Sequence, residues 1–554
     1  LHLLSRRQRQ MCIRDRYKNV DLKEFYNVFN PMNEPKIKTM IQMIEMDSNV
    51  KTIFEDLCRY YMLDQDEEIT LLKQGKYPIK EFTRCLKVLE NIGLVIYDSR
   101  KVQVAEQGYS EIDLYKRFIP NIKYINAMNT STFAKTIVSH WSVIAVVAVL
   151  IYYSIFSHEF QLYWDDQWQV INSMTNDGIS LKNLQTIFHS ISNGQYSPIN
   201  QLYYTLIHLC FGYSSLAFHI GNLLFHIFNA CLVYLLAYSF IRNHFDSKKA
   251  LGISFFTALL FAIHPVQVET VCWISASKIV LSTFFYLSAL ICYIQYMRNS
   301  KWQYLLASVV SSILAMGCKE QSVIIVPCLL LFDWMLFKRN MRSLKVYIEK
   351  VYYLIPAIAI FIVTLVANKN TGEEIIGYTI VDRFIFLCYS SFKYLLISAI
   401  PFKLSYLYPF PFQVGEKIPM ALWIYPFVIL FIGYVIYLNR RKPLLVFCTL
   451  FFILHLLPVL HVIPLPRYVV AADRYLYIPY IAFAIGLSIL SYHLYERQRK
   501  WILYAGFLYC SYLCVYTAGY APAWKNSDTL KEHFKEVLKK RETNLSINFK
   551  HEKQ

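Results

Sequence analysis

The sequence lacks any pair of cysteines with the two-residue spacing of zinc and redox sites, although it contains 13 cysteines. The cysteines occur singly, and no set of Cys and His residues has the spacing of metal ligands. The sequence therefore gives no signal for a zinc module or a dithiol redox site. Single cysteines in apolar surroundings behave as small hydrophobes, so we expect them to pack in the core.

Charged residues are also scarce: they form 17% of the 554 residues, whereas hydrophobic residues form 56% and aromatic residues 16%. Repeated apolar runs reach roughly 18 to 22 residues, which is the length that crosses a bilayer core. A cleavable signal peptide is missing as well, because the first strong apolar run begins near Ile137 and is long enough to be a signal anchor. The composition predicts a polytopic membrane protein.

The formal net charge of +18 could indicate a nucleic-acid partner, but Lys and Arg gather in short loops between the apolar runs. Such loops stay on the cytoplasmic side of membrane proteins, so membrane topology explains most of the charge. The basic clusters lie at residues 242–249, 298–301, 338–350, 440–442 and 497–500. All of them fall on one side if the amino terminus is cytoplasmic.

The sequence predicts about 11 membrane spans. They lie near residues 137–156, 218–241, 251–264, 279–297, 303–316, 322–337, 350–367, 420–438, 443–460, 476–494 and 501–519. A further apolar run lies at 384–400. If it crossed the membrane, the basic clusters before and after it would no longer fall on the same side. Lys393 interrupts it and Pro401 ends it, so we expect an in-plane or re-entrant element on the outer face.

This topology predicts a multi-pass protein of the cell (inner) membrane with a cytoplasmic amino terminus. The loop that holds residues 165 and 166 and the carboxyl terminus are then extracytoplasmic.

The amino-terminal part is predicted to be soluble. Residues 1–16 resemble translated sequencing adaptor and are excluded from fold reasoning. Within residues 17–125, helical periodicity over 79–92 is followed by a predicted hairpin at 94–105. This order resembles a small cytoplasmic winged-helix domain, with 79–92 as its recognition helix and 94–105 as its wing.

Such a domain either binds DNA or serves as a cytoplasmic interaction domain. Its basic residues are few and no more clustered than on a solvated surface, which favours the interaction domain. The candidate DNA contacts are Lys80, Arg84, Lys87, Arg100 and Lys101.

The tripeptide Trp164-Asp165-Asp166 places two adjacent carboxylates just past the first apolar segment. A hydrated acid pair at a membrane surface indicates chemistry there. The same outer loop, residues 157–217, predicts helices that lie along the interface. Ser180 stands as an N-cap before a periodic stretch, and residues 196–211 are apolar and aromatic.

Several motifs follow one another in a fixed order along the membrane part. They are WDD at 164–166, HIGNLLFH at 219–226, HPVQVE at 264–269 with SK at 277–278, CKEQ at 318–321 and ADRYLYIP at 472–479. This succession, over residues 137–535, resembles the transmembrane and tetratricopeptide-repeat protein O-mannosyltransferases and their bacterial relatives. The resemblance implies an all-α membrane glycosyltransferase domain of the C-type fold at 137–519. It further implies transfer of a sugar, mannose in that family, from a polyprenyl-phosphate carrier to a hydroxyl of a protein or glycan acceptor.

The acid pair suits this chemistry. Inverting glycosyl transfer needs one carboxylate as general base for the incoming hydroxyl, opposite the phosphate leaving group. Asp165 or Asp166 fits that role. Adjacent carboxylates raise each other's pKa, so that one stays ionised as the base while the other orients the acceptor. The sequence does not assign the two roles.

The leaving phosphate requires cations at the membrane surface. The candidates are Arg474, Lys319 and Lys278, with Arg474 favoured because its planar fork can hold two phosphate oxygens. Glu269 either pairs with Lys278 or acts near the donor together with His264.

The remaining motif residues have structural interpretations beside functional ones. Glu320 either forms a plain ion pair with its neighbour Lys319 or belongs to the site. Asp473 could pair locally with Arg474, and Tyr475 is a supporting residue of the site. His219 and His226 recur on one helix face and are expected to be packing and hydrogen-bond partners rather than metal ligands. No cofactor is expected, since the lipid-linked sugar is a substrate, and a divalent metal is not expected either.

The tail, residues 520–554, resembles the junction at which family members begin their tetratricopeptide repeats. It holds about one amphipathic helix, at 527–541, which is too little for a repeat array. Either the gene is truncated or this branch dispenses with repeats. Acceptor recognition by the tail is therefore in question, whereas the lack of repeats does not touch the transfer site.

Two other classes of function stay open. One is a membrane-anchored transcriptional sensor whose winged helix binds DNA. The other is a lipid-linked glycan transporter. Two features argue against a transporter: the charged groups cluster at one face instead of at the midplane, and the sequence shows no paired broken helices and no inverted repeat.

Overall fold

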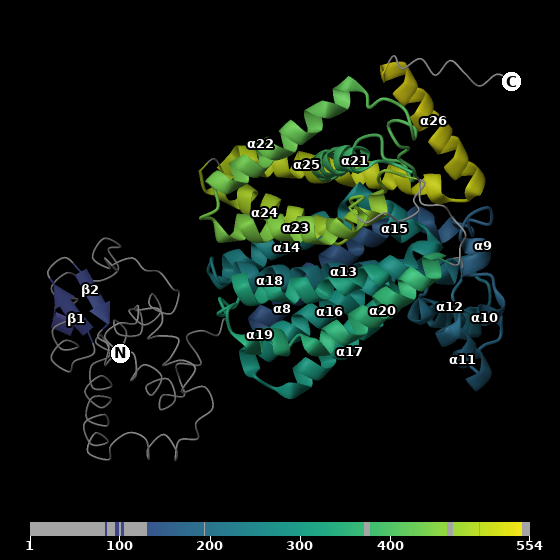
Figure 1. Cartoon of the computed structure of the whole chain (residues 1–554). Helices are drawn as coiled ribbons and strands as arrows, with labels where there is room; N and C mark the ends of the chain where they lie inside the picture. The colour runs from purple at the N-terminus through teal and green to yellow at the C-terminus, as the bar shows by residue number, and fades with distance from the viewer. Residues whose placement is uncertain are drawn as a thin grey trace. The chain divides into compact units, whose positions relative to one another are not determined.

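The computed structural model describes residues 84–85, 95–98, 101–104, 130–192, 194–369, 377–462, 469–497 and 499–545. The chain divides into two compact units, residues 1–136 and residues 137–554. The first unit contains a hairpin of β1 (Val95–Asp98) and β2 (Lys101–Val104) (Figure 1). The strands are antiparallel, with Val95 opposite Val104 and Asp98 opposite Lys101.

This hairpin confirms the one predicted at residues 94–105. Valine, isoleucine and tyrosine fit a pleated surface, and a two-residue connection closes the pair. Of the predicted recognition helix, Arg84 and Cys85 are helical, and the rest of that helix lies outside the described residues. Lys80, Lys87 and Arg100 lie outside them too. The winged helix therefore stays a prediction.

The second unit is helical. Its longer helices are α8 (Thr130–Ile151), α13 (Ser215–Ile241), α14 (Ser247–Ile263), α16 (Ser277–Asn299), α17 (Trp302–Cys318), α18 (Ile325–Met335), α20 (Val351–Lys369), α21 (Ile380–Ala399), α22 (Ile424–Leu438), α23 (Pro443–Leu456), α24 (Pro479–Arg497), α25 (Arg499–Tyr520) and α26 (Ser527–Leu545). The short helices α15 (Val268–Cys272) and α19 (Leu344–Ile348) connect longer ones. Each predicted span coincides with a helical segment.

The number of spans is not confirmed. Within the part of the chain that the structure describes, five helices are long and apolar enough to cross a membrane, and the bent pair Ser247–Ile263 and Pro265–Cys272 would make a sixth. The predicted spans at 303–316, 350–367 and 443–460 lie in shorter apolar helices, and the one at 322–337 coincides with α18, which has 11 residues. The helices identify a multi-pass membrane protein, while its sidedness stays a prediction.

The segment predicted at 384–400 as an in-plane or re-entrant element belongs to α21, a continuous helix of 20 residues. It begins with a capping box, in which Thr379 accepts a hydrogen bond from the backbone of Asp382 while the Asp382 carboxylate accepts from that of Thr379. Helix α21 packs against α22. Its position relative to a bilayer stays a prediction.

Helices α13, α14, α16 and α17 form the centre of this unit, where they lie side by side (Figure 1). In α14 the small residues Ala250, Ser254, Ala258 and Ala262 are fully buried at four-residue spacing. Small side chains at that spacing let helices approach closely where no water drives them together. By contrast, only 11% of the apolar window of α22 or of α25 is buried, against 72% for α16. The apolar faces of α22 and α25 are therefore available to lipid.

Candidate functional site

The loop after α8 contains four α-helices: α9 (Asp166–Gln169), α10 (Ser173–Asn176), α11 (Leu181–His189) and α12 (Pro198–Phe211). The acid pair lies at the start of α9. The Ser180 hydroxyl accepts from the backbone N–H of Asn183, which confirms the predicted N-cap. Helix α12 confirms the predicted apolar aromatic helix in this loop and begins with Pro198, whose missing N–H is no loss at a first turn. Helix α9 contacts the 3-10 helix Ile274–Ala276, which directly precedes α16.

Asp166 is fully buried and held by three donors. One carboxylate oxygen accepts from the Gln161 backbone N–H at 2.8 Å. The other accepts from the Ser275 backbone N–H at 2.9 Å and from the Ser275 hydroxyl. Burial raises the pKa of Asp166 to about 6. The hydrogen bonds act in the opposite direction and lower this pKa, whereas the neighbouring Asp165 raises it. Asp166 therefore fixes the loop to the segment before α16 and has no free face for a substrate.

Asp165 stands at the N-terminus of α9 and is partly exposed. Its carboxylate accepts a hydrogen bond from the Gln169 side-chain amide at 3.0 Å. The two adjacent acids are thus distinct, because one is enclosed by donors and the other opens to the surroundings. This difference separates roles that the sequence left open.

Lys278 lies at the start of α16 with 8% of its surface exposed. Its ammonium group donates to the side-chain oxygen of Gln169 at 3.2 Å and to that of Gln195 at 2.6 Å. Gln169 therefore connects Lys278 with Asp165, since it accepts from the first and donates to the second. The predicted pair of Lys278 with Glu269 is wrong.

Glu269 pairs with Arg474 instead. One oxygen of the buried Glu269 lies 2.5 Å from the Arg474 Nη1, and the other accepts from the Arg474 backbone N–H at 2.8 Å. Burial opposes a charge on Arg474, but Glu269 outweighs it and raises the pKa of Arg474, which stays cationic. The guanidinium also lies over the rings of Trp273, at 5.8 Å, and Tyr475, at 5.0 Å.

Lys319 and Glu320 form the ion pair that was one of the two interpretations, with 3.2 Å between the ammonium and carboxylate. Burial alone would raise the pKa of Glu320, but Lys319 holds it below its ordinary value. Both residues, together with Asp165 and Arg474, are close enough to Lys278 to interact with it electrostatically. We call these residues the site cluster: Asp165, Glu269, Lys278, Lys319, Glu320 and Arg474.

The other predicted residues have structural contacts. His264 accepts a hydrogen bond from the Val266 backbone N–H at 3.3 Å, which caps the 3-10 helix Pro265–Gln267, and its ring lies 4.1 Å from that of Tyr480. Asp473 does not pair with Arg474, because its carboxylate accepts from the Tyr408 hydroxyl at 2.7 Å.

The two histidines of α13 pack as expected. The His226 ring nitrogens lie 2.8 Å from the Tyr477 hydroxyl and 3.1 Å from the Ala262 carbonyl oxygen. The ring of His219 lies 5.5 Å from that of His158. Among the residues that the structure describes, no three His, Cys, Asp or Glu side chains are grouped to hold a metal ion.

The tail contacts the loop that carries the acid pair. The Gln161 side-chain amide donates to the Trp524 carbonyl oxygen at 2.8 Å, and the Glu159 backbone N–H donates to that of Lys525 at the same distance. The Trp524 ring stacks on Trp273, with 5.8 Å between centroids. The segment before α26 therefore supports the loop whose Gln161 N–H holds Asp166.

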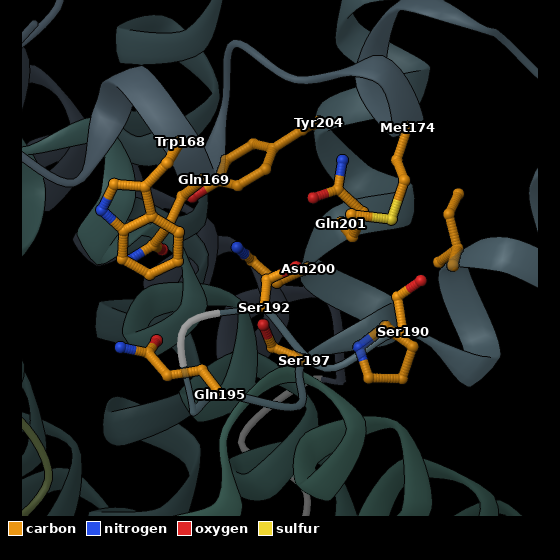
Figure 2. A pocket seen from close by; sticks show the side chains of 12 residues that line it. Trp168, Gln169, Met174, Ser190, Ser192, Gln195, Ser197, Asn200, Gln201 and Tyr204 are labelled. Atoms are coloured by element: carbon orange, nitrogen blue, oxygen red, sulfur yellow. The ribbon is translucent and has the colours of Figure 1, made fainter. Parts of the chain in front are cut away.

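Sequence reasoning missed the neutral residues of the site. Gln169, Gln195 and Ser275 connect or anchor the charged groups, but uncharged side chains in a loop give no pattern. Gln169 and Gln195 also line a polar pocket among α9 to α12, with about 410 Å³ of space including its mouth (Figure 2). The position of Gln169 three residues after Asp166 was the one available signal, because a helix there puts it beside Asp165.

No family model matches the chain, and no curated protein is significantly similar to it. Several solved structures are similar to it, and two of them are the following. The Archaeoglobus fulgidus oligosaccharyltransferase, tethered with an acceptor peptide that contains the NVT sequon, is 12% identical over 72% of this chain and 55% of that one, with a TM-score of 0.36. ArnT from Cupriavidus metallidurans, bound to undecaprenyl phosphate, is 11% identical over 73% of this chain and 79% of that one, with a TM-score of 0.34. The chain thus spans about half the length of the oligosaccharyltransferase, and at these TM-scores neither structure informs the roles of its residues.

Proposed function

We propose that the chain is an integral membrane glycosyltransferase of the C-type fold. It transfers a sugar, mannose by the family resemblance, from a polyprenyl-phosphate carrier to a hydroxyl of a protein or glycan acceptor on the extracytoplasmic face. The observation that carries this proposal is the site cluster. One accessible carboxylate, Asp165, and three basic side chains, Lys278, Lys319 and Arg474, converge there from four separate segments of the chain.

Asp165 is the general base in this proposal. It takes the proton of the acceptor hydroxyl while the acceptor oxygen bonds to the anomeric carbon. The bond from that carbon to the phosphate oxygen breaks, and the electron pair leaves with the phosphate. Asp166 is a positioning residue, because its three hydrogen bonds hold the Gln161 and Ser275 segments together next to the base.

Arg474 binds the departing phosphate. Glu269 occupies one guanidinium nitrogen and the backbone N–H, which orients the side chain, and the fork retains further donors for phosphate oxygens. Lys319 adds a cation nearby, and Lys278 lies close enough to interact with both Lys319 and Arg474. Electrostatic stabilisation of a charge that develops in the transition state is often the largest contribution to catalysis.

The test is sugar transfer from radiolabelled polyprenyl-phosphate mannose by membranes that contain the full chain. We expect Asp165→Asn to lower the rate about 100-fold or more, since loss of a general base has that size. Asp246→Asn is the matched control, because Asp246 is an exposed N-cap of α14 and asparagine caps a helix equally well.

Wild-type rates in Asp165→Asn would contradict the proposed base. If the wild-type chain transfers no mannose, donors with glucose, galactose and arabinose follow. Failure of the whole panel would reject the enzyme and favour the sensor with its predicted winged helix.

A further inference from the structure

The pocket among the loop helices is lined by neutral side chains. Trp168, Gln169, Gln195, Gln201 and Tyr204 are among its lining residues (Figure 2). None of its 12 lining residues carries a charge.

These groups match the chemistry of a sugar. Glutamine and serine side chains both donate and accept hydrogen bonds, as a sugar hydroxyl does. Trp168 adds a flat aromatic ring, which offers an apolar surface beside polar groups. A phosphate or a carboxylate would find no cation among the lining residues, so an uncharged ligand is favoured.

One wall of the pocket is held in place before any ligand binds. The Gln201 amide donates to the Thr175 hydroxyl at 2.8 Å, and the Tyr204 hydroxyl donates to the Ile274 carbonyl oxygen at 3.2 Å and accepts from Ser277 at 2.7 Å. Side chains that are already fixed lose little conformational entropy on binding. The wall is therefore suited to recognition.

Another part of the lining connects with the site cluster. Gln169 lines the pocket and hydrogen-bonds both Asp165 and Lys278, and Gln195 lines it and accepts from Lys278. Trp168 lies three residues after Asp165 and donates its backbone N–H to the Asp165 carbonyl oxygen at 3.2 Å. A ligand in the pocket thus lies next to the proposed base.

We propose that this pocket binds one neutral monosaccharide unit, with Trp168 against its apolar face and amide and hydroxyl groups at its hydroxyls. Its part in catalysis rests on the proposed function, whereas sugar binding itself does not. The unit belongs either to the donor or to a glycan acceptor, and both present the same chemistry to the pocket.

Binding is tested first, by saturation-transfer NMR with the detergent-purified full chain. The probes are the methyl glycosides of mannose, glucose, galactose and arabinose, with methyl glucuronide as the charged comparison. We expect transfer to the ring C–H protons of at least one neutral glycoside and none to the glucuronide. Trp168→Ala should weaken binding about tenfold, the effect of an aromatic contact of roughly 1.4 kcal/mol.

Two further variants keep this test specific. Trp168→Phe keeps a flat ring and should restore most of the binding. Trp302→Ala removes a tryptophan that is 65% exposed on α17 and should change nothing. Failure of every neutral glycoside to bind the wild-type chain would overturn the proposal, as would unchanged binding in Trp168→Ala.

Asp165→Asn separates this proposal from the proposed function, since it should abolish transfer while sugar binding persists. Steady-state transfer by Trp168→Ala then identifies the source of the sugar. A higher KM for the lipid-linked donor assigns the pocket to the donor, and a higher KM for the acceptor assigns it to the acceptor. Wild-type KM for both substrates would overturn the catalytic part of the proposal.

Discussion

The site cluster and a second group of charges lie toward opposite ends of α16 and are built in different ways. The second group, which we call the ion-pair cluster, consists of Asp333, Arg339, Glu349 and Lys350. Lys278 belongs to the site cluster, and Tyr293 contacts the ion-pair cluster. These two residues are about 22 Å apart along the helix.

In the ion-pair cluster every charge meets an opposite charge directly. Lys350 lies 2.6 Å from Asp333, and Arg339 lies 2.5 Å from Glu349 and 3.3 Å from Asp333. The Tyr293 hydroxyl donates to Asp333 at 2.5 Å and accepts from Lys350 at 2.7 Å. Two acids and two bases are thus neutralised inside the protein.

The site cluster also contains two direct ion pairs, Glu269 with Arg474 and Lys319 with Glu320, but neutral amides stand between Asp165 and Lys278. Gln169 lies between Asp165 and Lys278, and Gln195 accepts from Lys278 on its other side. Among the described residues, no carboxylate forms an ion pair with Lys278. The comparison teaches that closed ion pairs fix helices in place, whereas charges that are only hydrogen-bonded to amides retain attraction for a charged substrate.

The largest effect is expected when the ion-pair cluster is broken. Asp333→Ala leaves Lys350 buried without its closest acid, which destabilises proteins by about 3 to 5 kcal/mol. Thermal unfolding of the purified chain measures the loss. The double variant Asp333→Asn with Lys350→Met removes both charges and should recover much of the stability. An unfolding temperature equal to that of the wild type in Asp333→Ala would show that this cluster does not stabilise the folded chain.

The pH dependence of stability tests the burial of Asp166. Burial raises its pKa from an ordinary value of 3.8 to about 6, so the folded state binds the proton more tightly. This group's contribution to stability is therefore present at low pH and is lost as the pH rises from about 4 to about 6, by roughly 3 kcal/mol. Unfolding temperatures across this range should fall more steeply for the wild type than for Asp166→Asn. Parallel curves would contradict the raised pKa.

The orientation of Arg474 is tested through its acid partner. Glu269→Gln weakens a hydrogen bond between charged groups, worth about 1.5 to 3 kcal/mol, so the KM for the lipid-linked donor should rise about 10- to 100-fold. Glu349→Gln makes the same change in the ion-pair cluster and should leave that KM unaltered. Equal donor KM values in the two variants would remove the distinction between the clusters.

The smallest effect concerns the support from the tail. Gln161→Leu deletes the hydrogen bond to the Trp524 carbonyl, which should lower the free energy of unfolding by about 1 kcal/mol and speed proteolysis of the tail. Gln295→Leu deletes an exposed contact with Asn299 on α16 and serves as the control. If both variants resist protease like the wild type, the tail does not hold the loop.

Local features of the fold could be predicted from the sequence because each depends on neighbouring residues. The hairpin follows from β-branched residues around a two-residue turn, and the Ser180 cap follows from its position before a periodic stretch. Apolar runs give the positions of the helices, but not how many of them cross, because helices such as α18 are too short to decide by length.

The site could be predicted only in part. The acid pair and the cations are visible as charged motifs, and the structure brings them together. Their partners are not visible, since Ser275 is 109 residues from Asp166 and Arg474 is 205 residues from Glu269. Proximity in sequence favoured Lys278 as the partner of Glu269, but tertiary packing decides which charges meet.

The most direct test of the account compares one acid from each cluster in two assays. Asp165→Asn and Asp333→Asn are measured for sugar transfer per folded molecule and for unfolding temperature. We predict that Asp165→Asn loses transfer by about 100-fold at a nearly unchanged unfolding temperature, and that Asp333→Asn unfolds earlier while its folded fraction transfers normally. Full transfer by folded Asp165→Asn would contradict the account.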